Sequence, residues 1–215
     1  MLLGLNWLSG RFERANLRNI VFMGMGEPLM NFANLIRSLR VISDPRGFGF
    51  SRRRITVSTV GLPKVLEELG RTDLASLAVS LHAPTQDLRE KIMPKAARVP
   101  ISRLMAALRA FPRRERQRIT FEYLLLADVN DAPEQARQLV RLIAGIKSKV
   151  NLIGFNPGRT DLAGADGRPF RPSSPERILT FQKILRDSGL IAVLRKSKGS
   201  DIKAACGQLL PVRAL

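Results

Sequence analysis

His82 and Cys206, the only histidine and the only cysteine of the chain, are the first candidates for chemistry. The single histidine rules out a histidine pair, and the single cysteine rules out an intrachain disulfide or an all-cysteine metal site. A lone histidine after a strand is more often structural than catalytic, and a lone cysteine is more often a buried apolar side chain. The basic residues Arg195 and Lys203 near Cys206 would, however, favour its thiolate and raise its nucleophilicity.

Glu27 is the third candidate, because it follows an apolar run at residues 20–25 in the motif GMGEP. The motif lacks the third glycine of a dinucleotide fingerprint and places an anion where a pyrophosphate would bind. A carboxylate next to Gly26 instead suits a ligand with a positive group, such as the ammonium of an amino acid. The alternative is a turn in which Glu27 is merely solvated, and the motif alone leaves both interpretations open.

Polar side chains stand at or just after the carboxyl ends of four predicted strands, where α/β proteins bind ligands. They are Glu27, Ser58, His82 and Asn156. Such convergence favours one site at one edge of a parallel sheet. Ser80 belongs to the same group, because strand alternation places it on the same side as His82.

The elements that would position these residues alternate between strand and helix, which predicts an α/β fold with a parallel sheet. A part-barrel and an open doubly wound sheet share this pattern, and the polar strand ends favour the barrel. Residues 1–18 show no clear period, so we expect an irregular segment there and one core domain over 19–215. Predicted strands cover residues 19–24, 55–60, 74–81, 119–126, 150–155 and 191–195.

Helix boundaries are predicted from residues that cap helices. Asn31 is a candidate N-cap for a helix over 32–43, and Gly70 a C-terminal stop for the helix that Pro63 opens. Asp131 and Glu134 have the spacing of a capping box for the helix that follows them.

The chain carries 36 Lys+Arg against 18 Asp+Glu, a net charge of +18. Such a charge attracts polyanions, of which nucleic acid is the commonest, although a solvated arginine-rich surface is the alternative. One cysteine fits a reducing cytoplasm, and no stretch is long and apolar enough to predict a membrane span. The basic clusters lie at residues 52–54, 113–118, 168–171 and 195–198.

Several runs of sequence, taken together and in order, resemble the RlmN/Cfr-type radical S-adenosylmethionine (SAM) methyltransferases, and RlmN more closely than Cfr. A single run such as GEP or SLHAP is a weak signal, whereas the ordered set is strong. The runs are NIVFMGMGEPLMN (19–31), GFGFSRRRITVSTVG (47–61), AVSLHAP (78–84), ITFEYLLLADVN (119–130), NLIGFNP (151–157) and VLRKSKGSDIKAACGQL (193–209).

The resemblance implies a partial (β/α) barrel of the radical SAM type that binds SAM at its mouth. Cys206 matches the cysteine that carries the methyl group in this family. The residues that the resemblance assigns to SAM are Gly26, Glu27, Ser58, Ser80, Leu81, His82 and Asn156.

The implied reaction uses SAM twice and adds a methyl group to carbon-2 of an adenosine in 23S rRNA, and some members also modify tRNA. One SAM methylates the cysteine, and a second is cleaved to a radical that takes a hydrogen atom from the resulting S-methyl group. The carbon radical formed in this way adds to an electrophilic carbon that a polar methyl transfer could not reach. A [4Fe-4S] cluster and a reductant protein such as flavodoxin are the further implied partners.

The sequence also departs from the family pattern. The cluster motif C-x-x-x-C-x-x-C, the first barrel strand, the N-terminal domain, a second cysteine and an upstream proton-accepting glutamate have no match. One cysteine cannot supply the three thiolates of a cluster. We therefore expect a C-terminal fragment that is inactive alone. The alternatives are a cluster-less RNA-binding remnant without catalysis and a different α/β-barrel enzyme acting on a phosphorylated metabolite.

Overall fold

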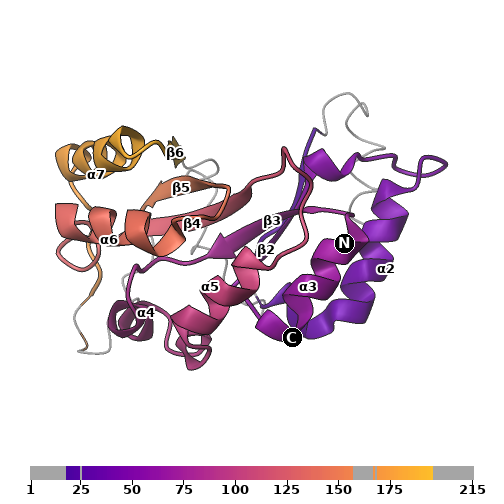
Figure 1. Ribbon diagram of the computed structural model, residues 1–215, viewed down its shortest axis with the longest axis horizontal. Helices are drawn as coiled ribbons and strands as arrows, with labels where there is room; N and C mark the ends of the chain where they lie inside the picture. The colour runs from indigo at the N-terminus through magenta and orange to yellow at the C-terminus, as the bar shows by residue number, and fades with distance from the viewer. Residues whose placement is uncertain (1–17, 25, 157–166, 168, 196–215) are drawn as a thin grey trace, which may run out of the picture.

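One parallel sheet of six strands forms the centre of the protein (Figure 1). The computed structural model describes residues 18–24, 26–156, 167 and 169–195 of the 215. Strand order along the sheet is the order along the chain, which confirms the predicted α/β fold with parallel strands. The strands are β1 (Ile20–Phe22), β2 (Ile55–Thr59), β3 (Ser76–Ser80), β4 (Ile119–Leu125), β5 (Ser148–Gly154) and β6 (Ile191–Arg195).

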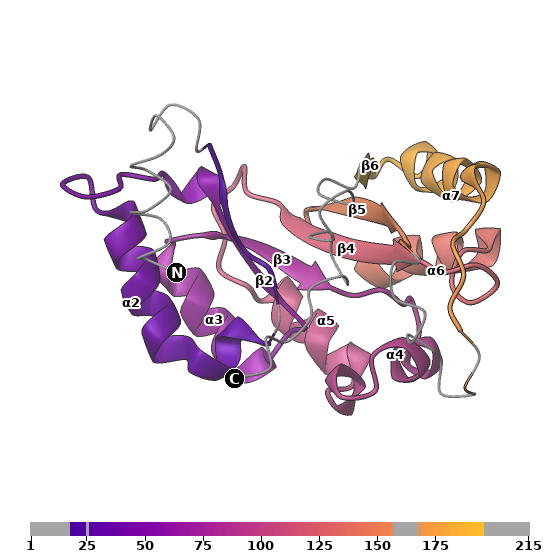
Figure 2. The same ribbon diagram turned by 180° about the vertical axis from the view of Figure 1, so that it is seen from behind.

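The helices lie along one side of the curved sheet, as the two opposite views in Figures 1 and 2 show. No helix within the described ranges is long and apolar enough to cross a membrane. The irregular segment expected at 1–18 lies, except for residue 18, outside the described residues. The helices are α2 (Phe32–Ser43), α3 (Pro63–Thr72), α4 (Gln86–Ile92), α5 (Ile101–Arg109), α6 (Pro133–Ile143) and α7 (Pro175–Asp187), with 3₁₀ turns η2 (Pro28–Asn31), η3 (Arg52–Arg54) and η4 (Ala96–Arg98).

Alternation along the strands separates an apolar face from a polar face. In β4, Phe121 and Tyr123 belong to the hydrophobic core that the helices cover, and the Tyr123 ring lies 5.1 Å from the ring of Phe181 in α7. The residue between them, Glu122, points to the opposite face. There it is flanked by Ser80 of β3 and Asn151 of β5, its register partners. The polar face of the sheet is therefore the one that can bind a ligand.

The two edge strands approach each other at their carboxyl ends. Arg195 Nη1 at the end of β6 lies 3.6 Å from the sulfur of Met23, which follows β1. Within the described residues the hydrogen-bonded ladders run from β1 to β6 without closing the ring. The sheet is thus curled but open, as expected for a part-barrel.

One predicted helix boundary is wrong for a reason of tertiary packing. Gly70 lies inside α3, which continues to Thr72. A Cβ atom at Gly70 would lie 2.8 Å from Cδ of Pro112, so the glycine permits a close approach of the following loop. The helix predicted over 32–43 is confirmed as α2 with Asn31 as its N-cap residue, although Oδ1 of Asn31 accepts its hydrogen bond from the Asn34 side chain instead of from a helix N–H.

The capping box predicted at Asp131 and Glu134 is also wrong. Helix α6 begins at Pro133, and the side chain of Gln135 accepts a hydrogen bond from the N–H of Ala132, 3.0 Å away. Asp131 is instead buried, where it accepts hydrogen bonds from the N–H of Asp128 and from the guanidinium of Arg177 in α7. The carboxylate therefore ties α7 to the loop after β4.

Candidate functional site

A small pocket of about 120 Å³ opens at the carboxyl ends of β1, β2 and β3. It brings together Gly26, Glu27, Ser58 and Ser80, four of the residues that the sequence places in a site. Phe22 and Val60 are among the apolar residues that complete its wall. Strand ends far apart in the chain thus meet at one edge of the sheet, as the strand alternation predicts.

The Glu27 carboxylate joins the turn after β1 to the end of β2. Its Oε1 accepts hydrogen bonds from the N–H of Leu29 (2.9 Å) and from Oγ1 of Thr59 (2.7 Å). Its Oε2 accepts one from the N–H of Val60 (2.8 Å). Glu27 is therefore more than a solvated turn residue, and Oε2 retains a lone pair for a positive group. The turn itself needs glycine at position 26, where φ is +88°.

The hydroxyl groups of Ser58 and Ser80 are the unused polar groups of the pocket. Both side chains lie on the polar face of the sheet and line the pocket beside Glu27. Neither hydroxyl makes a hydrogen bond to a residue that the structure describes. Each can therefore donate to and accept from a bound ligand.

His82 lies beyond the pocket, at the seam between the ends of β3 and β4. Its Nδ1 accepts a hydrogen bond from the N–H of Leu124, 3.0 Å away, which leaves the ring proton on Nε2. Loss of hydration by burial, together with the positive charge of Arg89, lowers the pKa of His82 to about 4. The imidazole is thus neutral at pH 7 and can act as a hydrogen-bond donor. Its φ of 56° is unusual for a residue other than glycine.

Arg89 of α4, which is fully buried, holds the ends of β2 and β3 together. Its guanidinium donates to the carbonyl oxygens of Val60 (2.7 Å) and Leu81 (3.4 Å). Burial lowers the pKa of Arg89 to about 10, so the group stays charged at neutral pH. Val60 is thereby fixed from both sides, since its N–H binds Glu27 and its carbonyl binds Arg89. The side chain of Leu81 is buried in the core.

Asn130, which sequence reasoning did not single out, supports the backbone around His82. Its Nδ2 donates to the carbonyl oxygens of His82 (2.8 Å) and Leu124 (2.7 Å), and its Oδ1 accepts from the N–H of Leu126 (2.8 Å). The side chain is fully buried. The only sequence signal for Asn130 is its place between a predicted strand and a predicted helix. That signal does not reveal its contact with His82, which is 48 residues away in the chain.

Glu122 is a second residue that the sequence did not reveal as part of the site. It is 3% exposed, and its Oε1 accepts a hydrogen bond of 3.0 Å from the side chain of Asn151. Burial raises the pKa of Glu122, although the Asn151 bond and the charges of Arg195 and Lys149 oppose this shift. The polar face therefore contains an acidic group beside Ser80.

Like Leu81 and His82, the expected site residue after the fifth strand does not line the pocket. Asn156, just after β5, is half-buried and makes no hydrogen bond to a described residue. Cys206 lies outside the described residues, so its assignment stays a prediction. Within the described ranges, no group of three or more His, Cys, Asp or Glu side chains could hold a metal ion.

We expect acid to destabilise the protein through His82. The folded-state pKa of about 4 lies below the ordinary 6.5, so the unfolded chain binds a proton that the native state does not between these values. The contribution of His82 to stability should therefore be constant above pH 6.5 and fall between pH 6.5 and 4, by about 1–3 kcal/mol after allowance for residual solvent contact.

Urea denaturation at several pH values would measure this effect against a His82→Asn variant. Asparagine tolerates the left-handed backbone conformation but does not titrate, and the carboxylates common to both proteins cancel in the comparison. Identical pH dependence of the two proteins would contradict the prediction.

Comparison with known proteins gives a consistent result, although no family model matches the chain. It is 54% identical over 209 residues to the dual-specificity RNA methyltransferase RlmN of Solidesulfovibrio magneticus, covering 97% of this chain and 58% of that protein. It is 50% identical over 197 residues to RlmN of Lawsonia intracellularis, covering 92% of this chain and 53% of that protein. The chain thus spans about half the length of the curated relatives it matches.

Solved structures show the same relationship at the level of the fold. A radical SAM methyltransferase from Sphaerobacter thermophilus superposes with a TM-score of 0.80 at 45% identity, covering 89% of this chain and 54% of that one. A domain of a pyruvate-formate lyase-activating enzyme from Bacteroides vulgatus gives a TM-score of 0.62 at 17% identity, covering 83% of this chain and 99% of that one. The second likeness concerns the fold alone.

Proposed function

Because the chain belongs to the RlmN/Cfr-type family of radical SAM methyltransferases, we propose that it forms the SAM-binding core of an RNA adenosine methyltransferase. The proposed reaction is methylation of carbon-2 of an adenosine in 23S rRNA and in tRNA. Cys206 is the proposed carrier of the methyl group. The proposed setting is the cytoplasm, with a reductant protein such as flavodoxin as partner.

The observation that carries the proposal is the pocket in which Gly26, Glu27, Ser58 and Ser80 meet. SAM supplies a methyl group and, at its methionine end, an ammonium group. The free lone pair of Glu27 Oε2 suits the ammonium, and the two serine hydroxyls suit polar atoms of the same ligand. At about 120 Å³ the pocket accommodates one end of SAM rather than the whole molecule.

The residues of this chain do not fit the [4Fe-4S] cluster that the family also uses. A cluster of this kind is held by thiolates, and the sequence contains one cysteine. We therefore assign no reaction step to a cluster on this chain, and we propose that the 215-residue chain alone does not methylate RNA.

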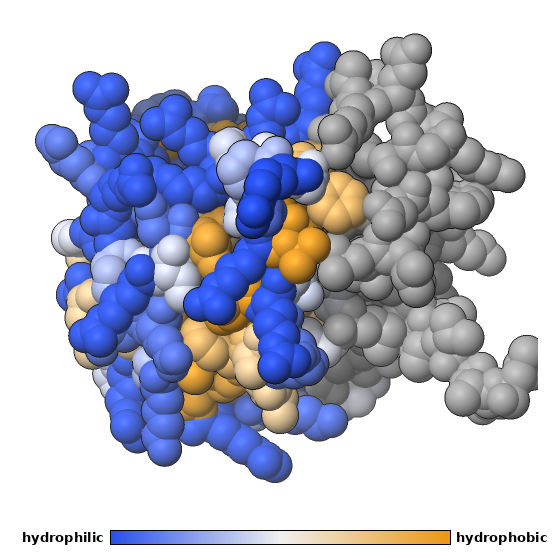
Figure 3. Space-filling view, turned by 90° about the vertical axis from the view of Figure 1, so that its right-hand side faces the viewer, coloured by the Kyte–Doolittle hydropathy of each residue, from blue (hydrophilic) through white to orange (hydrophobic). Residues whose placement is uncertain are grey.

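An RNA substrate is supported by the charge of the protein. The net charge of +18 would attract a phosphate backbone. On the face seen in Figure 3, long hydrophilic side chains project around a smaller hydrophobic area. The same charge favours the second candidate function, an RNA-binding protein without catalysis.

SAM binding by the full 215-residue chain, measured by isothermal titration calorimetry, tests the proposal. We expect Ser58→Ala and Ser80→Ala each to weaken SAM binding about five- to tenfold, the effect of one lost hydrogen bond. Thr180→Ala, on the exposed surface of α7, should leave the affinity unchanged. If the wild type bound RNA but not SAM, the RNA-binding candidate would replace the methyltransferase core.

A further inference from the structure

A second and larger hollow, of about 360 Å³, lies between the beginning of α3 and the beginning of α5. Its floor is apolar and is formed by Leu62, Val65, Val99 and Pro100. The two helices pack side by side, as both ribbon views show (Figures 1 and 2). We call this hollow the α3–α5 groove.

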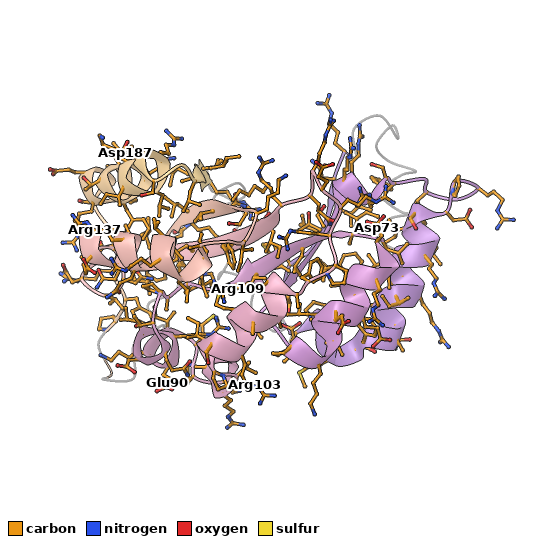
Figure 4. All side chains as sticks on the ribbon, in the orientation of Figure 1. Asp73, Glu90, Arg103, Arg109, Arg137 and Asp187 are labelled. Carbon is orange, nitrogen blue, oxygen red and sulfur yellow. The ribbon has the colours of Figure 1, made fainter. Side chains whose placement is uncertain are left out.

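Three cations surround the floor of the α3–α5 groove. They are Lys64 of α3, Arg98 of η4 and Arg103 of α5, all of them exposed. Figure 4 shows Arg103 at the beginning of α5. No carboxylate lines the groove, and none of the three cations belongs to an ion pair with another described residue. Arg52 and Arg177, by contrast, are paired with aspartates. The rim therefore offers three positive charges to an anionic partner.

The α3–α5 groove and the proposed SAM pocket are lined by residues that lie two positions apart in the sequence. Val60, at the end of β2, lines the pocket, and Leu62, two residues later, lines the groove. The short segment between them includes Gly61, whose φ is +90° and which lies close against Leu104 of α5. The two hollows therefore adjoin at this point of the chain.

We propose that the α3–α5 groove binds a nucleotide of single-stranded RNA next to the modification site. Its base would lie on the apolar floor, and Lys64, Arg98 and Arg103 would contact the flanking phosphates. Only an unstacked base can present its face to such a floor, so the groove selects single-stranded over double-stranded RNA. This inference rests on the proposed function, because that function supplies an RNA ligand at the neighbouring pocket.

An acidic peptide would match the rim charges but not the floor. Carboxylate side chains would use the cations and leave the apolar surface uncovered, whereas a nucleotide combines an anionic backbone with a large apolar face. The combination of both features in one hollow is therefore what favours RNA.

The test measures binding of a fluorescein-labelled single-stranded RNA of about 12 nucleotides to the full 215-residue chain by fluorescence anisotropy. The groove variant is Lys64→Gln/Arg98→Gln/Arg103→Gln. The matched control is Arg37→Gln/Arg40→Gln/Arg116→Gln, which removes the same charge from exposed cations that make no ion pair in the described part of the chain. A third variant, Val99→Asp, changes the floor and leaves the three cations in place.

We expect the groove variant to weaken RNA binding about tenfold or more and the control less than about threefold. Loss of three phosphate contacts should also reduce the slope of log affinity against log salt by about 2. Val99→Asp should weaken binding of the ordinary RNA more than binding of the same RNA with abasic sites. Circular dichroism and thermal unfolding would establish that each variant is folded.

Equal losses in the groove variant and the control would overturn the groove proposal while leaving the proposed function intact. The same conclusion would follow if poly-glutamate competed for the groove as well as RNA does. If the wild type bound neither SAM nor RNA, the proposed function itself would fail, and the groove proposal with it.

Discussion

Replacing Asn130 by alanine should lower the free energy of unfolding by about 3–5 kcal/mol, the largest loss of stability that we expect from any polar side chain of the site. The substitution removes three hydrogen bonds at once, to the carbonyls of His82 and Leu124 and to the N–H of Leu126. The N–H of Leu126 would be left buried and the two carbonyls half-buried without this partner, which costs more than the net value of the bonds. Urea denaturation would measure the loss.

A local effect on His82 should accompany this loss of stability. Without Asn130 the backbone carbonyl of His82 is no longer held, so the Nδ1 bond to Leu124 should loosen and the ring should regain water. We therefore expect the pKa of His82 to rise from about 4 toward its ordinary 6.5, as measured by NMR of the imidazole.

Asn34→Ala is the matched control for Asn130→Ala. Asn34 is exposed on α2, and its one side-chain bond goes to Asn31, so the change should cost about 0.5 kcal/mol or less. If Asn130→Ala cost no more than this control, Asn130 would not be the support that the geometry indicates.

Glu27→Ala should weaken SAM binding by about 100-fold or more, the largest effect on ligand binding that we expect. The change removes the proposed partner of the ligand's ammonium. It also releases the N–H groups of Leu29 and Val60 and the hydroxyl of Thr59, which hold the pocket wall. The free energy of unfolding should fall by about 2–3 kcal/mol at the same time.

Glu27→Gln separates the charge from the hydrogen bonds. The amide oxygen can still accept from Leu29 and Thr59, but its NH₂ group faces the N–H of Val60, and the negative charge is gone. We expect SAM affinity to fall by about 30- to 100-fold while the protein stays folded.

Isothermal titration calorimetry would measure the SAM affinity of both Glu27 variants. Glu68→Gln, on the exposed side of α3, is the control. An affinity within about threefold of wild type for folded Glu27→Gln would show that the carboxylate serves the turn alone.

The predicted elements agree with the structure because they depend on short-range patterns. Apolar runs predict the strands β2 and β4, and a helical period predicts the helix over 32–43. Each pattern can be recognised without knowing how the elements pack against one another. Strand and helix alternation then requires parallel strands, so the sheet and the edge that carries Glu27, Ser58 and Ser80 could be expected before any coordinates.

Only the tertiary structure decided what these side chains contact. The partners of Glu27 at Thr59 and Val60 are 32 and 33 residues away, and Asn130 reaches His82 across 48 residues. Such pairs depend on the strand register and on the exact path of the loops, which the local pattern of apolar and polar residues does not encode. Gly70 does not end its helix for the same kind of reason, since the loop that approaches it lies about 40 residues further along the chain.

The sequence by itself therefore determined the class of fold and the edge of the sheet at which Gly26, Glu27, Ser58 and Ser80 meet, and the order of its motifs indicated the RlmN/Cfr-type family. The tertiary structure decided which polar groups are already used in holding strand ends together and which remain free for a ligand. The physical reason is that burial and hydrogen bonding belong to pairs of residues brought together by packing, whereas strand and helix periods belong to the chain itself.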